Sequence, residues 1–125
     1  MKITEQNTLQ DIQREFGALF PHLKLDFFSA AHHPGEGSPD ANRLDPNLKL
    51  QDVGRAPKEG TLSISPSMTV AELEKKFREV FELNVQVMRQ SGNLWMQTTA
   101  TDAWTLERQN RKGGSSKTHY DQKYQ

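Results

Sequence analysis

The sequence predicts an α+β fold made of two tandem strand–helix–strand units. Two runs of apolar residues repeat with identical spacing, 61 positions apart in the chain. They comprise Leu9, Ile12, Phe16, Leu19 and Phe20 in the first run, and Val70, Leu73, Phe77, Val80 and Phe81 in the second. This spacing places each run on one face of a helix. An alternating apolar segment precedes and follows each run, as expected for half-buried strands.

In the first unit, Ile3 marks a weak opening strand, and the helix should begin at Thr8. Thr8 with Asp11 three residues later forms a weak version of a capping box. Pro21 ends the helix, because proline disfavours the α conformation in the preceding residue. The next strand covers 23–28, where apolar and polar residues alternate until Phe28.

Residues 30–60 form an insert rich in turn-forming residues and without periodicity. Asp45 followed by Pro46 predicts a short helical turn that packs Leu48 and Val53 against the core. An insert of this length in a small domain is often functional or mobile.

The second unit begins with a strand at 61–65, which Pro66 ends. Thr69 and Glu72 predict a full capping box for a helix that runs to about Leu83. Strands at 84–89 and 94–99 then flank a tight turn at 91–93, which predicts a hairpin.

Asp102 should cap a short final helix that contains Trp104 and Leu106. We therefore expect one α+β domain over residues 1–107. Residues 108–125 are polar, basic and aperiodic, which predicts a disordered tail.

Two β-α-β units in tandem give the order of a ferredoxin-like two-layer sandwich, with strand 94–99 extending the sheet edge. If the strand at Ile3 does not form, the second unit could stand alone. The segment TLSISPSMTVAELEKKF (61–77), followed by strand, turn, strand and a short helix, then resembles the ubiquitin-like β-grasp pattern.

The stretch 68–110 also resembles a class of short uncharacterised bacterial proteins. The resemblance rests on MTVAEL (68–73) and DAWTLERQN (102–110). No activity is assigned to that class, so the resemblance implies no catalytic residue.

Charge and composition restrict the function classes. Sixteen basic and sixteen acidic residues cancel, and residues 1–104 carry eleven Lys and Arg against fourteen Asp and Glu. A mildly acidic body argues against strong binding of a phosphate backbone. There is no cysteine, no secretory signal and no apolar run of membrane-spanning length. We expect a cytoplasmic protein that does not engage a membrane.

No pattern indicates catalysis or a cofactor. The motifs GxSxG, GxxxxGK and GxGxxG do not occur in the sequence. His32 and His33, with Glu36 and Asp40, could hold a divalent metal, but their spacing matches no zinc motif. A solvated loop is the preferred interpretation, and we expect neither a metal site nor an enzyme.

Protein association is the remaining class. A two-layer domain leaves one sheet face without helices, and Phe28, Met88, Trp95 and Met96 are the candidates for that face. The competing interpretation places Trp95 and Trp104 in the core beneath the last helix. We predict a non-enzymatic interaction domain that can self-associate through its sheet, with the protein partner unknown. A single-stranded nucleic-acid-binding module is the alternative.

Overall fold

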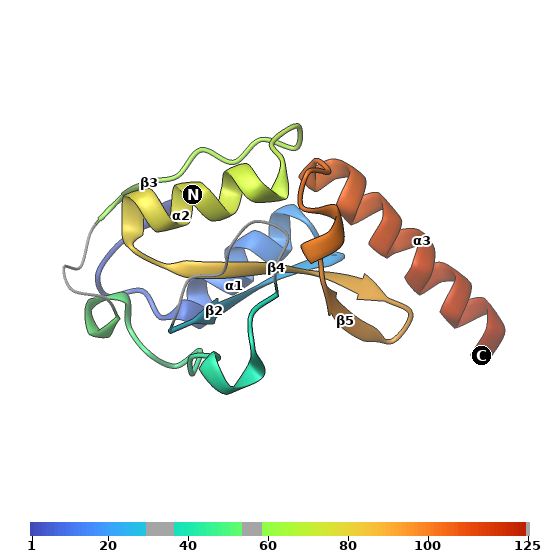
Figure 1. Cartoon of the computed structure of the whole chain (residues 1–125), viewed down its shortest axis with the longest axis horizontal. Helices are drawn as coiled ribbons and strands as arrows, with labels where there is room; N and C mark the ends of the chain where they lie inside the picture. The colour runs from blue at the N-terminus through green and yellow to red at the C-terminus, as the bar shows by residue number, and fades with distance from the viewer. Residues whose placement is uncertain (30–36, 54–58, 125) are drawn as a thin grey trace.

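The computed structural model describes residues 1–29, 37–53 and 59–124 (Figure 1). These residues form an α+β fold with three α-helices and two antiparallel sheets. In chain order the elements are β1 (Lys2–Ile3), α1 (Leu9–Leu19), β2 (Leu23–Phe28), β3 (Gly60–Thr61), α2 (Val70–Phe81), β4 (Asn84–Ser91), β5 (Leu94–Gln97) and α3 (Leu106–Tyr124). Single turns of 3-10 helix lie at Asp40–Asn42, Leu50–Asp52 and Thr99–Thr101.

The strands pair differently from the expected single sheet. β1 pairs with β3, and the larger sheet has the order β2-β4-β5. β2 pairs with β4 from Leu23 opposite Arg89 to Phe28 opposite Asn84. This pairing does not confirm the ferredoxin-like detail. All described pairings are antiparallel, and they give no support to the β-grasp alternative either.

The main core lies between α1, α2 and one face of the larger sheet. Phe77 of α2 meets Phe27 of β2 edge to face, with ring centres 6.4 Å apart. Leu25 of β2 pairs with Val87 of β4, and both side chains are buried in the same core as Phe27 and Phe77. Leu19 and Val80, which the sequence places on the two apolar stripes, are instead exposed.

The helix caps reverse the prediction. In α1 the Thr8 hydroxyl accepts from the Asp11 N–H at 3.1 Å, and the Asp11 carboxylate accepts from the Thr8 N–H at 2.9 Å. This is a complete capping box. In α2 the Thr69 hydroxyl accepts from the Glu72 N–H and donates to the Glu72 carboxylate, both at 3.1 Å. The Glu72 side chain is therefore bonded to the cap hydroxyl.

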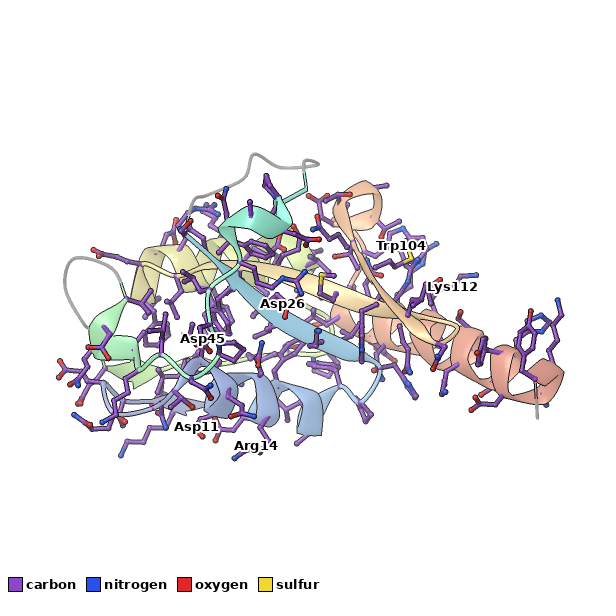
Figure 2. All side chains as sticks on the ribbon, turned by 90° about the horizontal axis from the view of Figure 1, so that it is seen from below. Asp11, Arg14, Asp26, Asp45, Trp104 and Lys112 are labelled. Atoms are coloured by element: carbon purple, nitrogen blue, oxygen red, sulfur yellow. The ribbon has the colours of Figure 1, made fainter. Side chains whose placement is uncertain are left out.

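Residues 37–53 cover part of the sheet face opposite the helices. Arg43 lies with its guanidinium 5.8 Å from the Phe28 ring centre and 3.3 Å from the Asp26 carboxylate. In Figure 2, Asp26 projects between β2 and this segment. Leu48 and Val53 pack against the core as predicted. Asp45 begins a turn, where its carboxylate accepts from the Asn47 N–H at 2.9 Å, and the 3-10 turn of this segment comes later, at Leu50–Asp52.

Helix α3 replaces the disordered tail expected for residues 108–125, and it is described as far as Tyr124. Its docking explains why a Gly-Gly-Ser-Ser sequence is helical here. A Cβ atom at position 113 would lie 2.9 Å from the His22 carbonyl oxygen, so glycine permits a close approach to the start of β2. The His22 N–H donates to Asn110 at 2.9 Å, and the Gly92 N–H donates to Ser116 at 2.7 Å. Tertiary contacts thus override the low helix propensity.

Candidate functional site

Strand β5 forms one edge of the larger sheet and returns from β4 through a two-residue loop. Ser91 pairs with Leu94, and Gly92 between them has φ 60°. A positive φ at the first loop residue fits a type II′ turn, which matches the twist of the two strands. The strand ends where Thr98 donates to the Val87 carbonyl through both its N–H (3.3 Å) and its hydroxyl (2.9 Å).

The outer edge of β5 is open within the part of the chain that the structure describes. The strand order places β4 on one side and no described strand on the other. Among the described residues, no bond between backbone groups joins β5 to anything except β4. The Gln97 side chain, at the end of β5, accepts from the Ser38 N–H at 3.0 Å and donates to the Ser38 carbonyl at 2.8 Å. A strand edge of this kind presents unpaired N–H and C=O groups to another chain.

Three consecutive apolar side chains lie exposed on this edge strand. The exposed fractions are 72% for Leu94, 39% for Trp95 and 41% for Met96. Natural edge strands usually carry charges, proline or bulges that discourage pairing. β5 has no charged residue and no proline. The combination of an open edge and an apolar strand marks β5 as the candidate contact element.

The structure separates the four side chains that the sequence suggested for one sheet face. The register places Phe28, Met88 and Trp95 on the face that residues 37–53 partly cover, whereas Met96 pairs with Arg89 and points to the helix face. Phe28 and Met88 are buried, so they cannot form part of an exposed contact surface. Trp95 and Met96 are exposed, on opposite faces of β5.

Trp104 stands beside β5 in a cluster with two arginines, which we call the Trp104 cluster (Arg89, Trp104 and Arg108). The Arg108 guanidinium lies 3.7 Å from the Trp104 ring centre and that of Arg89 lies 5.5 Å from it. These are cation–π distances. Arg89 also donates to Gln109 at 2.8 Å and to the Met96 sulfur at 3.5 Å, which connects the cluster to β5.

Burial affects the two arginines of this cluster differently. Desolvation lowers the pKa of the Arg89 guanidinium from its ordinary value, because burial disfavours the charged form. Arg108 is exposed on the outside of α3. Trp104 itself is only partly buried, and it does not belong to the core that α1 and α2 form with the sheet. Its ring instead holds the Arg108 side chain in place.

The charges of α3 are segregated around the helix. At 100° per residue, Arg108, Lys112 and Lys123 lie on one side of the helix, and we call them the basic row. The acidic residues lie elsewhere: Glu107 is 4.0 Å from Arg111, and Asp121 is 2.9 Å from Lys117. Among the described residues, Arg108 and Lys112 make no ion pair.

A shallow groove of about 390 Å³ runs from Trp104 along this helix, lined by Trp104, Arg108, Arg111, Lys112 and Ser115. Figure 2 shows Trp104 and Lys112 on the side of α3 where the β4–β5 hairpin lies. The sequence reasoning missed the basic row because it treated these residues as a disordered tail. The signal was present: Arg108 and Lys112 recur at helical spacing with no acidic residue between them.

The described residues contain no group of three or more His, Asp or Glu side chains that could hold a metal ion. His32, His33 and Glu36 of the suggested metal loop lie outside the described residues, and Asp40 is instead hydrogen bonded to Arg43 at 2.9 Å. Within the same residues, no helix has both the length and the apolar character needed to cross a bilayer.

Comparison of the chain with models of protein families, with curated proteins and with solved structures gives no significant match. The resemblance of residues 68–110 to short bacterial proteins therefore stays a prediction.

Proposed function

We propose that this chain is a non-enzymatic protein-interaction domain whose contact surface is the open edge of β5. The observation that carries the proposal is the exposure of Leu94, Trp95 and Met96 in succession on that edge. Exposed apolar side chains on a strand with unpaired backbone groups are what strand addition requires.

The geometry supports binding by strand addition. An incoming extended segment would take up the free N–H and C=O groups of β5 and lengthen the sheet by one strand. Its side chains would alternate between the two faces, where Leu94 and Met96 flank one side and Trp95 the other. Backbone bonds would supply affinity, and these three side chains would supply selectivity.

Self-association provides a readout that needs no knowledge of the partner. Two copies can pair β5 with β5 about a two-fold axis, because an antiparallel strand pair is self-complementary. We expect the average mass in light scattering to rise with concentration between about 1 µM and about 1 mM, as for a weak edge contact.

Met96→Lys should suppress this association, since a charge on an edge strand opposes pairing. Val80→Lys is the matched control, because Val80 is an exposed apolar residue on α2, away from β5. Thermal unfolding of both variants controls for stability. The proposal fails if the chain stays monomeric throughout the range and no extended peptide binds to it.

The basic row supports a second candidate, a single-stranded nucleic-acid-binding module, since cations along a groove attract phosphates. Titration of a labelled oligonucleotide at low and high salt tests it, and binding that falls steeply with salt is the expected signature.

A further inference from the structure

We infer that the occupant of the β5 edge is an extended segment of another protein that carries acidic side chains. This inference rests on the proposed function and specifies its partner. The observation behind it is that positively charged side chains lie on both sides of β5, whereas β5 itself has no charged residue.

Cations flank β5 on both sheet faces. On the helix face, the Trp104 cluster contacts Met96 through Arg89, and the basic row continues along α3 with Lys112. On the other face, the Lys24 ammonium lies 5.5 Å from the Trp95 ring centre and 3.6 Å from the Asp26 carboxylate, so the helix face carries the larger part of the unpaired positive charge. Residues 94–97 carry no charge themselves. A segment added to β5 therefore lies between basic groups, and acidic side chains complement them.

Strand geometry brings such side chains within reach on the helix face. Successive residues of an added strand alternate in direction, so every second side chain points to the face of Leu94 and Met96. That face also holds Arg108, whose guanidinium is fixed against Trp104 at 3.7 Å. A fixed planar guanidinium offers paired donors to a carboxylate, and less side-chain entropy remains to be lost on binding.

A second copy of the chain fits this surface less well. When two β5 strands pair about a two-fold axis, their helix faces form one continuous face, and the two basic rows flank the same seam. Arg108 and Lys112 of each copy would then approach those of the other, and like charges disfavour the contact. An acidic segment meets the same cations with opposite charge.

Nucleic acid is also a poorer match to the whole surface. A phosphate backbone cannot replace the peptide groups that the open edge of β5 needs. Base stacking on Trp104 would have to displace the Arg108 guanidinium from the ring.

The test compares labelled peptides of about eight residues, the usual length of a strand. One alternates Glu and Val, one alternates Thr and Val, and one alternates Glu and Pro, which removes every second backbone donor. A single-stranded oligonucleotide of similar length is the fourth probe. Binding to the full chain is followed by fluorescence anisotropy at about 0.05 M and about 0.3 M salt.

We expect the Glu-Val peptide to bind most tightly and the Glu-Pro peptide to bind least. The double variant Arg108→Glu, Lys112→Glu should weaken Glu-Val binding by about tenfold or more, because attraction becomes repulsion. Lys2→Glu, a charge reversal on β1 of the other sheet, should leave it unchanged. The double variant should not suppress self-association at high protein concentration, whereas Met96→Lys should suppress self-association, because it places like charges on the two paired strands.

Each other result overturns the inference in a recognisable way. Equal binding of the Thr-Val and Glu-Val peptides removes the acidic partner and leaves the proposed edge contact standing. Tighter binding of the oligonucleotide than of any peptide replaces the partner by a nucleic acid. Loss of all peptide binding together with strict monomer behaviour removes both the inference and the proposed function.

Discussion

Helices α2 and α3 both pack on β4, but they do so by different means. α2 buries Leu73, Phe77 and Phe81, an apolar stripe that continues the core. α3 buries Leu106 at its start and then Gln109 and Gly113, a polar residue and a residue without a side chain. An apolar stripe can be recognised in the sequence by its helical spacing, so it predicts its helix. A helix held by polar bonds and close approach becomes recognisable only with its neighbours in place.

The largest effect should come from the apolar contact. Phe77→Ala in α2 removes a fully buried ring that meets Phe27, and we expect a loss of about 3–5 kcal/mol in the free energy of unfolding. Chemical denaturation measures it. Val80→Ala, on the exposed side of the same helix, is the control and should change stability by less than about 0.5 kcal/mol. Similar losses in the two variants would contradict the assignment of α2 to the core.

The polar contact of α3 should come next. Gln109 donates to the Thr101 carbonyl and hydroxyl at 2.7 and 2.8 Å and accepts from Arg89 at 2.8 Å. Gln109→Leu keeps the volume of the side chain but removes these hydrogen bonds. We expect it to lower the free energy of unfolding by about 1–3 kcal/mol. Faster amide exchange in α3 should accompany the loss in denaturation experiments. Gln122→Leu, at an exposed position of the same helix, should do neither.

Glycine substitutions sharpen the comparison through their opposite signs. Gly113→Ala places a Cβ atom 2.9 Å from the His22 carbonyl oxygen and should destabilise the protein by about 1–3 kcal/mol. In α1, a Cβ atom at Gly17 meets nothing within 4 Å, so Gly17→Ala should stabilise by about 0.5–1 kcal/mol. Thermal unfolding of the two variants side by side decides the matter. A gain in stability for Gly113→Ala would mean that α3 does not sit this close to β2.

The smallest effect concerns the helix starts. The Thr105 hydroxyl accepts from the Arg108 N–H in α3, and α1 adds a carboxylate to the same kind of threonine cap. The Thr8 backbone N–H, with help from its hydroxyl, lowers the pKa of Asp11 below its ordinary 3.8. The folded pKa is depressed, so the stabilisation is present above about 3.8 and is lost as the pH falls through the lowered value.

Asp11→Asn should therefore reduce stability at neutral pH. It should also make the loss of stability on acidification between about pH 5 and pH 2 smaller than in the unchanged protein. Denaturation series at several pH values measure both. Glu15→Gln, which removes another carboxylate from α1, is the control. An unchanged acid profile in Asp11→Asn would show that the cap bond does not contribute.

The same contrast explains what the sequence could predict. Local rules predicted the starts of α1 and α2, the β4–β5 hairpin, and the packing of Leu48 and Val53. These rules work because caps, turns and apolar spacing act over a few residues. They did not predict the pairing of β2 with β4, because alternation shows that a strand is half buried without naming its neighbour. Phe28 is buried where Arg43 of the 37–53 segment crosses the sheet, and no local pattern in the sequence shows that crossing. Gly113 and Gly114 led to a prediction of disorder, because the residue that they approach, His22, lies about 90 residues away in the chain.

The short length of β5 has a kinetic consequence. β5 has four residues and ends where the Thr98 hydroxyl bonds to the Val87 carbonyl. An added strand can therefore pair with it over only about 13 Å. Differences in affinity among related complexes arise mostly from the dissociation rate. A ladder this short should therefore release its partner quickly, and residence times should be brief even where the flanking cations speed capture. A domain built in this way suits contacts that form and exchange repeatedly more than permanent assembly.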